Sequence, residues 1–311
     1  MAFRIGPDDF KPESDIMSSA TDEILVPTPM REASTNTKPR FTLPANSCDV
    51  HFHVFEPGYP CVQRPHYSFP DGNLAKYLAV CSHLGIDRMV LVQPSYYGTD
   101  NRLTIDTLTK LGGRARGVVM VEETVTDAEL DRFHAAGVRA IRLDLFARAK
   151  WPRDELHRYI ERMLEKTRPR GWHIQFYTPG YVVRDLIPFL ATLRDDFVID
   201  HMGYMLEEDG LSRADFDRLL ELMRTGGAWL KLSGPYRIAK AKGYKAVEHL
   251  AKAIVETRPE RAIWGSDWPH LTDGSRDTGE LVNLLVDWIP DEKMRHQVLV
   301  ENPAGLFSFE R

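Results

Sequence analysis

A strand–helix pattern that repeats from Cys48 onward constrains the fold of this chain more than any other feature. Short β-rich runs alternate with longer amphipathic stretches, and Gly85, Gly137, Gly171 and Gly227 each stand just before the next strand. Glycine there can take the left-handed conformation that ends a helix. The eight expected strands are residues 49–55, 88–93, 115–121, 138–144, 172–177, 197–200, 228–233 and 261–265.

Candidate capping residues support the helices between these strands. Asp71 precedes the amphipathic stretch 72–84, and Thr126 with Asp127 precedes another. Their side-chain oxygens can accept hydrogen bonds from the first-turn N–H groups. Repeated alternation of strand and helix indicates a parallel sheet, and eight repeats without a break favour an α/β fold closed into a (β/α)8 TIM barrel. A doubly wound open sheet is the alternative.

The chain divides into an N-terminal extension, residues 1–45, and a single barrel domain, residues 46–311. A chain of 311 residues that is 43% hydrophobic can bury the core of one barrel. The extension is polar and lacks the apolar centre of a secretory signal, so we expect an arm. Nowhere does an apolar run reach the roughly 18 residues of a membrane span.

Charge and cysteine content restrict the partners. The net charge is −5 and the calculated pI is about 6.1, so the chain has no basic footprint for nucleic acid. Any anion site must then be a local concentration of arginines. The three cysteines, Cys48, Cys61 and Cys81, are an odd number, which is typical of a reduced cytoplasmic protein without a disulfide framework. The composition indicates no oligomeric state.

Histidines and an aspartate follow the expected strands where a barrel carries its active site, at the strands' carboxyl ends. His51 and His53 are two residues apart on the first strand and therefore share a face. His201 follows the sixth strand and Asp267 the eighth. A histidine pair alone is a weak signal, but the combination is specific. We expect the four side chains to meet in one cavity.

Arg142 alternates with apolar residues inside the fourth strand. A guanidinium that faces the barrel interior keeps its proton and so needs an anionic partner. A protein carboxylate such as Asp144 could serve. The alternative is a carboxylate of the substrate, to whose binding Arg148 and Arg237 in neighbouring loops would add. Several arginines at one site imply a substrate with more than one negative group.

Over about residues 48–307 the sequence resembles the amidohydrolase superfamily, and more closely its 2-pyrone-4,6-dicarboxylate hydrolase-like branch. The stretches that carry the resemblance are "DVHFHVF", "RPHYSFP", "HLGIDRMVLVQPS", "GTDNR", "ARGVVMV", "AGVRAIRLDL", "RGWHIQFY", "VIDHMGY", "SGPYRI", "IWGSDWPH" and "ENPAGLF". The resemblance implies an enzyme that hydrolyses a small polyanionic lactone in the catabolism of aromatic compounds.

The resemblance also assigns roles to individual residues. Asp267 would activate water, and the histidines His51, His53 and His201 would polarise the lactone carbonyl. The residues that would bind the substrate's acidic groups are Tyr67, Ser95, Arg142, Arg148, Tyr177 and Arg237. Ser95 aligns less firmly than the others, because the following Tyr96 and Tyr97 depart from the dicarboxylate pattern.

The metal content follows from the same resemblance. Binuclear members of the superfamily need a lysine or carboxylate on strand four and a histidine on strand five, where this chain has Arg142 and Tyr177. A guanidinium beside the site opposes a divalent metal. We therefore expect no cofactor. One zinc ion, held by Asp267 and the three histidines, is the alternative, since three or four nitrogen and oxygen ligands suffice.

Other functions fit parts of the pattern. A zinc-dependent 4-sulfomuconolactone hydrolase and a sugar-acid lactone isomerase use the same scaffold, and a decarboxylase or hydratase of ring-fission products is also compatible. A barrel without catalytic activity would have no need of the histidines and Asp267. The chain has no GxSxG motif, so we expect no covalent acyl-enzyme.

Overall fold

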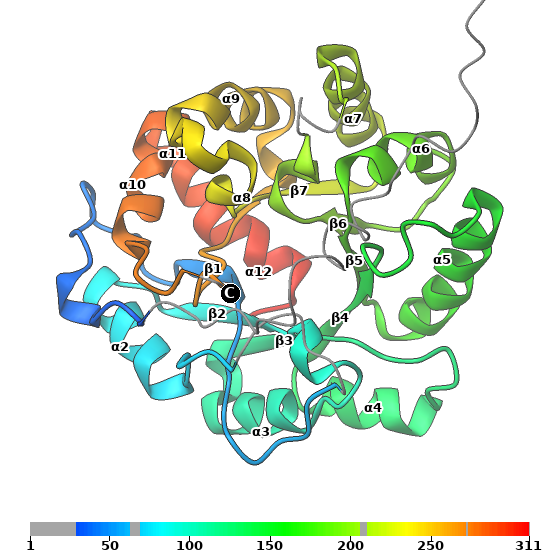
Figure 1. Ribbon diagram of the computed structural model, residues 1–311, viewed down its shortest axis with the longest axis horizontal. Helices are drawn as coiled ribbons and strands as arrows, with labels where there is room; N and C mark the ends of the chain where they lie inside the picture. Colours follow the sequence, from blue (N-terminus) through cyan, green and yellow to red (C-terminus); the bar gives the residue numbers. More distant parts are fainter. Residues whose placement is uncertain (1–28, 63–68, 206–209, 272, 311) are drawn as a thin grey trace, which may run out of the picture.

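The computed structural model describes residues 29–62, 69–205, 210–271 and 273–310. Eight parallel strands follow one another around a barrel in chain order, and helices surround them (Figure 1). The strands are β1 (Cys48–Phe52), β2 (Arg88–Val92), β3 (Ala115–Val119), β4 (Val138–Asp144), β5 (His173–Tyr177), β6 (Phe197–Ile199), β7 (Ala228–Leu232) and β8 (Ala262–Trp264). All eight overlap the expected ranges, which confirms the expected α/β architecture.

The outer helices connect successive strands, and the last ones follow β8. The helices are α2 (Leu74–Leu84), α3 (Arg102–Leu111), α4 (Asp127–Ala135), α5 (Arg153–Thr167), α6 (Gly180–Leu190), α7 (Arg213–Thr225), α8 (Pro235–Ala239), α9 (Glu248–Thr257), α10 (Thr278–Trp288), α11 (Glu292–His296) and α12 (Asn302–Leu306). No described helix is long and apolar enough to cross a membrane.

The barrel is closed by backbone contacts between β1 and the segment after β8. Asp267 N donates a hydrogen bond to His51 O at 2.8 Å, and His53 N donates one to Trp268 O at 2.8 Å. Gly265 lies at this seam, where a Cβ atom would come within 2.6 Å of His51 Cβ. Only glycine allows the two segments to approach so closely. This favours the closed barrel over the open sheet.

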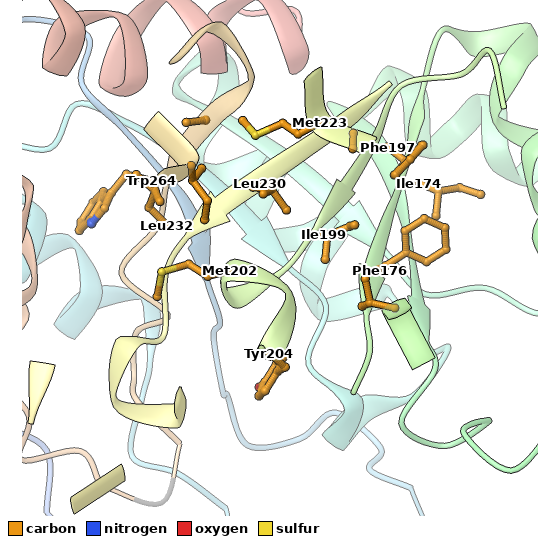
Figure 2. Packing of buried hydrophobic residues seen from close by; sticks show 14 of the residues in the cluster. Ile174, Phe176, Phe197, Ile199, Met202, Tyr204, Met223, Leu230, Leu232 and Trp264 are labelled. Carbon is orange, nitrogen blue, oxygen red and sulfur yellow. The ribbon is translucent and has the colours of Figure 1, made fainter. Parts of the chain in front are cut away.

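Alternate side chains of the strands pack outward against the helices. Figure 2 shows Ile174 and Phe176 of β5 beside Phe197 and Ile199 of β6. The rings of Phe176 and Phe197 meet edge to face, with centroids 5.7 Å apart. Each such side chain contributes roughly 1.5–3 kcal/mol when it is fully buried. The outward-facing side chains therefore hold the helices against the barrel, and the inward-facing side chains occupy the barrel interior.

The glycines expected to end helices in the left-handed conformation do so in part. Gly85, Gly137 and Gly171 have positive φ, as expected. Gly227 does not; a Cβ atom there would lie 2.1 Å from Asp195 O, so this glycine permits a close backbone approach instead.

Of the two expected N-caps, one agrees with the structure and one does not. Thr126 caps α4 by accepting from Glu129 N, as expected. The cap of α2 is Asn73, which accepts from Lys76 N, and the expectation of Asp71 was wrong. The cap position is set by where the helix begins, and α2 begins two residues later than the sequence suggested.

Residues 29–45, the described part of the predicted arm, lie beside α2 and α10 (Figure 1). Thr37 N donates to Asp277 Oδ1 at 3.0 Å and Arg40 N donates to Asn283 Oδ1 at 2.6 Å. In return, Asn36 Oδ1 accepts from Thr278 N at 2.8 Å. The segment therefore satisfies one first-turn N–H donor of α10, that of Thr278, and donates two hydrogen bonds to side chains of Asp277 and α10. Cys48, Cys61 and Cys81 are all free, as their odd number suggested.

The C-terminal segment closes the base of the barrel. Phe307 and Phe309, which follow α12, pack with inward residues such as Val90 and Trp229. His173, the first residue of β5, lies against the edge of Phe307, with ring centroids 5.0 Å apart. His173 is 4% exposed and its Nε2 has no hydrogen-bond partner among the described residues. Burial, with a smaller effect of the Lys231 charge, lowers the pKa of His173 to about 3.

This buried histidine should make stability depend on pH. Because its pKa is lowered in the folded state, His173 stabilises the fold fully above pH 6.5, and the contribution is lost as the pH falls toward 3. One proton taken up only on unfolding corresponds to about 1.4 kcal/mol per pH unit. In His173→Leu, we expect the loss of stability between pH 6 and 4 to be shallower by about that amount. Urea titrations at several pH values measure it.

A matched control separates titration from packing. His249 is exposed on α9, so His249→Leu is expected to keep the slope of the parent protein. Equal slopes for His173→Leu and the parent protein would show that His173 is not held neutral by the fold.

Candidate active site

The carboxyl ends of the strands bring together the three histidines and the aspartate singled out from the sequence. His51 belongs to β1 and His53 follows it, while His201 begins the 3-10 helix η5 (His201–Tyr204) directly after β6. Asp267 follows β8. All four are buried, between 0 and 3% exposed. Four segments far apart in sequence thus deliver one polar cluster to an apolar barrel.

The distances within the cluster are short. His51 Nε2 lies 3.3 Å from His53 Nε2, and Asp267 Oδ1 lies 3.6 and 3.7 Å from these two nitrogens. The ring of His201 is 5.0 Å from that of His51, between centroids. The spacing of two residues did place His51 and His53 side by side. A substrate atom or a water molecule at this point would touch several of the four groups at once.

The backbone is strained where it presents two of these side chains. His201 has φ of 49° and Asp267 has φ of 61°; neither residue is a glycine. Met202 and Tyr204 of η5 are also left-handed. Each such residue costs on the order of 1–3 kcal/mol, and strain of this kind persists where the surrounding structure enforces it, often at functional sites.

Asp49 holds the two central segments together from outside the barrel. Its Oδ1 accepts from His51 N at 3.0 Å and from Ser266 N at 2.9 Å. Its Oδ2 accepts from Ser266 Oγ at 2.5 Å and Tyr77 OH at 2.9 Å. Burial raises the pKa of Asp49 to about 6, although these hydrogen bonds lower it. One carboxylate therefore fixes the backbone next to both His51 and Asp267.

The two oxygens of Asp267 have different surroundings. Oδ2 accepts from Tyr236 OH and from Arg237 Nε, both at 2.5 Å and both on α8. Oδ1 has no hydrogen-bond partner among the described residues and faces His51 and His53. Burial raises the pKa of Asp267, but the charge and the hydrogen bond of Arg237, with a smaller effect of the adjacent imidazoles, outweigh it, and the net pKa lies well below the usual value. An ionised oxygen with free lone pairs thus points into the cluster.

The histidines are neutral. His53 Nδ1 lies 2.7 Å from Val92 O, and because a carbonyl can only accept, Nδ1 carries the hydrogen and Nε2 offers a lone pair. Burial lowers the pKa of His53 to about 3 and that of His201 to about 4. In this state His53 accepts a hydrogen bond, which differs from the expectation that all three histidines polarise a carbonyl.

Two buried charged residues that the sequence reasoning missed support the cluster. Lys231 of β7 and Asp200, the residue before His201, form an ion pair at 2.9 Å with both side chains 0% exposed. Lys231 Nζ also lies 3.2 Å from His51 Nδ1, and Gln175 Nε2 donates to Asp200 Oδ2 at 3.1 Å. Lys231 alternates with apolar neighbours in its strand, as Arg142 does, and the same argument would have found it.

Arg142 faces the interior as expected, at 5% exposure. Its guanidinium lies over the ring of Tyr177, 4.2 Å from the centroid. The carboxylate near it is Asp200, 3.7 Å from Nε, and not Asp144, which accepts from Ala147 N instead. The Nε atom has no hydrogen-bond partner among the described residues. Arg142 is therefore only partly neutralised by the protein.

Arg148 lies beside Arg142 on the wall of a cavity of about 360 Å³ that also includes Tyr97. Its Nη1 donates to Asp144 O at 3.0 Å, and its guanidinium lies over the ring of Tyr159, 4.8 Å from the centroid. These contacts leave further N–H groups of Arg148 for a ligand.

The other residues expected to bind the substrate differ in where they lie relative to the cluster. Tyr177 ends β5, with its ring 6.4 Å from that of His201. Ser95 is half-buried at the start of the 3-10 helix η2 (Ser95–Tyr97), after β2. Arg237 forms an ion pair with Asp267. Tyr67 lies outside the described residues.

Four cationic side chains gather around this site: Arg142, Arg148, Lys231 and Arg237. Lys231 and Arg237 pair with Asp200 and Asp267. Among the described residues, Arg142 and Arg148 donate hydrogen bonds to backbone carbonyls and to no carboxylate. On a chain of net charge −5, these two guanidinium groups attract anions to the end of the barrel where Asp267 lies.

His51, His53 and Asp267 have the spacing of metal ligands, with their ligand atoms within 4.8 Å of one another. The surroundings oppose a resident metal. A ligating histidine donates its other ring N–H to an acceptor, but the ammonium of Lys231, 3.2 Å from His51 Nδ1, has no lone pair to accept it. Two site arginines add further positive charge. The described side chains therefore do not fit a bound divalent metal well.

Comparison with known proteins identifies a family. The family model described as amidohydrolase matches residues 48–309. The chain is 35% identical to a 2-pyrone-4,6-dicarboxylate hydrolase of Comamonas testosteroni over 287 residues, which cover 87% of this chain and 93% of the relative. It is 33% identical to a 4-sulfomuconolactone hydrolase of Hydrogenophaga intermedia over 276 residues, which cover 86% and 90%.

A solved structure shows the same likeness. A protein of Acinetobacter baumannii assigned as a 2-pyrone-4,6-dicarboxylic acid hydrolase, with citric acid bound, superposes with a TM-score of 0.76 at 26% identity. The superposition covers 85% of this chain and all of that structure.

Proposed function

The chain belongs to the amidohydrolase family, and we propose that it hydrolyses a small lactone with more than one negative charge, such as 2-pyrone-4,6-dicarboxylate. The observation that carries the proposal is Oδ1 of Asp267, which has no hydrogen-bond partner among the described residues, is ionised and faces two neutral imidazoles, with Arg142 and Arg148 on the wall of the neighbouring cavity. Similarity to hydrolases of two anionic lactones supports it.

In the proposed reaction, a water molecule attacks the lactone carbonyl. Asp267 Oδ1 takes a proton from the water as its oxygen bonds to the carbonyl carbon. The carbonyl electron pair moves onto oxygen, where an imidazole N–H stabilises the oxyanion. Collapse of the intermediate breaks the ring C–O bond, and the leaving oxygen receives the proton from Asp267. The other histidine at this point, His53, accepts a hydrogen bond from the water through Nε2.

The arginines hold the substrate's acidic groups while this happens. Arg142 and Arg148 line one cavity, and their guanidinium groups can bind carboxylates by paired hydrogen bonds. Ser95, Tyr177 and, outside the described residues, Tyr67 are proposed as further contacts. The positive charge of Arg237 stabilises the ionised form of Asp267. The other guanidinium nitrogens of Arg237 are proposed to bind substrate. Citrate in the structure from Acinetobacter baumannii is itself a polycarboxylate, which supports this assignment.

A panel of lactones tests the function. We expect the purified protein to hydrolyse 2-pyrone-4,6-dicarboxylate or 4-sulfomuconolactone far faster than an uncharged lactone of similar size. Product analysis separates a ring-opened acid from the shifted ring that an isomerase would release from an aldaro-lactone. Activity confined to neutral lactones, or none on the panel, would refute the proposal.

Removal of metal is expected to leave the activity unchanged. The cations next to His51 and Asp267 oppose a resident zinc ion. We expect the protein as purified to contain far less than one zinc per chain, and kcat to stay within about twofold after dialysis against a chelator, for the same reason. Elemental analysis and rates before and after dialysis measure this. A loss of activity that zinc restores would instead support the sulfomuconolactone hydrolase alternative.

The pH dependence should report the depressed pKa values of the site. Asp267 must be ionised and His53 neutral, and since both pKa values are lowered, both conditions hold at neutral pH and below it. We expect kcat/KM, measured from initial rates, to stay level from pH 8 to about pH 6, the pKa of the Asp49 carboxyl that fixes the backbone beside His51 and Asp267. A base with the ordinary pKa of histidine, about 6.5, would instead lose activity about tenfold per pH unit below that value.

A further inference from the structure

Lys231 is buried next to both Asp200 and His51. Burial lowers the pKa of Lys231, and the charge of Asp200 opposes that shift, so the ion pair keeps Lys231 as an ammonium group. Its Nζ lies 2.9 Å from Asp200 Oδ1 and 3.2 Å from His51 Nδ1. An ammonium group has three donors and no lone pair. Lys231 must therefore donate to His51, and Nδ1 of His51 must be the unprotonated nitrogen.

The carboxylate next to this pair does not offer His51 an alternative. Asp200 Oδ1 lies 3.6 Å from His51 Nδ1, which is beyond a side-chain hydrogen bond. Its other oxygen accepts from Gln175. Asp200 thus holds the ammonium in place and leaves Nδ1 of His51 to Lys231.

The unprotonated Nδ1 of His51 determines the state of its other ring nitrogen, Nε2. Since Nδ1 is unprotonated, the hydrogen of neutral His51 is on Nε2, which donates to His53 Nε2 at 3.3 Å and lies 3.6 Å from Asp267 Oδ1. The three groups at this point are then one donor and two acceptors. A lactone carbonyl that enters finds its donor in His51, while the attacking water finds acceptors in Asp267 and His53.

We propose that Lys231, anchored by Asp200, is a positioning residue that holds His51 in the Nε2–H tautomer and so makes it the donor to the oxyanion. The role rests on the proposed hydrolysis, but the tautomer does not. The ammonium faces both Asp200 and His51 Nδ1, and it thereby keeps the carboxylate from taking the Nδ1 hydrogen bond that carboxylates commonly accept from histidine.

The test compares two variants. Lys231→Met leaves the Asp200 carboxylate as the group that faces His51 Nδ1. Lys231→Met/Asp200→Leu makes the back of His51 apolar, and it also removes the buried carboxylate with a weaker partner that could keep the single variant from folding. The tautomer is read from long-range ¹H–¹⁵N spectra of the ¹⁵N-histidine-labelled chain, with the His51 signals assigned by comparison with His51→Gln. Rates on the lactone panel are measured in parallel.

We expect His51 to carry its hydrogen on Nε2 in the parent protein and on Nδ1 in Lys231→Met, where Asp200 can accept it. In the double variant, His53 Nε2 and Asp267 Oδ1 are the remaining acceptors, so the Nε2 hydrogen is expected to return. The loss of an oxyanion donor in Lys231→Met lowers kcat about 100-fold or more, and the second substitution is expected to restore most of it. KM is not expected to rise in the double variant, since removing Asp200 leaves Arg142 free for the substrate. Arg116→Met, which removes a buried cation at the base of the barrel, is the matched control and is expected to retain both the tautomer and kcat.

Two kinds of result would overturn the inference. One is a parent protein in which His51 carries its hydrogen on Nδ1. The other is a folded variant, single or double, in which kcat does not follow the tautomer. If the parent protein hydrolyses no lactone, the proposed function fails, and the spectra still decide whether Lys231 sets the tautomer.

Discussion

Replacing Asp267 by asparagine is expected to lower kcat by about 10³-fold while leaving substrate affinity intact, since general base catalysis contributes 10²- to 10⁴-fold. The amide oxygen can keep the hydrogen bonds from Tyr236 and Arg237. The NH₂ group then points to His51 and His53 in place of Oδ1, and it has no lone pair for a proton. Steady-state rates on the best lactone of the panel measure the effect.

The same substitution is expected to affect the affinity for an anion differently from the rate. Asp267→Asn removes a negative charge from a site in which Arg142 and Arg148 make no hydrogen bond to a carboxylate among the described residues, so an unreactive polycarboxylate such as citrate is expected to bind as tightly as before or more tightly. Calorimetry measures that Kd. Asp287→Asn, the same change at an exposed residue that pairs with Arg40, is the control. A variant Asp267→Asn that keeps the parent rate would remove Asp267 as the base.

Arg142→Met is expected to reduce kcat/KM for a doubly charged lactone about 100-fold and for an uncharged one less than about threefold. A hydrogen bond to a charged partner contributes roughly 1.5–3 kcal/mol, whereas the methionine keeps the apolar contact with the ring of Tyr177. Asp200 remains paired with Lys231, so no carboxylate is left isolated. The ratio of the two losses measures how much of Arg142's role is recognition of charge.

The same substitution on a solvated helix gives the baseline. Arg158 is 58% exposed on α5 and pairs with Asp154, and Arg158→Met is expected to change neither rate. Equal losses on charged and neutral lactones in Arg142→Met would mean that the arginine supports the barrel and does not bind a substrate anion.

Local patterns were enough to find most of the candidate site. Strand ends in a parallel barrel face one side, so His201 and Asp267 could be placed near His51 without any structure. The spacing of two residues put His51 and His53 on one face. Alternation with apolar residues marked Arg142 as an interior charge, and it would have marked Lys231 equally well.

Other features could not be read from local patterns. The β1 ladder is irregular between Asp49 and Phe52, so Val50 packs inside the barrel while Asp49 reaches Tyr77 outside it. Strict alternation would have placed Asp49 on the same face as His51. The left-handed backbone of Asp267 likewise has no marker in its residue type.

The sequence by itself determined the barrel, the end at which its chemistry lies and the residue types present there, because strand periodicity and glycine stops act over a few residues. Only the tertiary structure decided the pairing of charges: Arg237 with Asp267, Asp200 with Lys231, and Lys231 with His51. These partners lie 30 or more residues apart. Which cation meets which carboxylate depends on distances across the barrel of a few ångströms, and no local pattern records them.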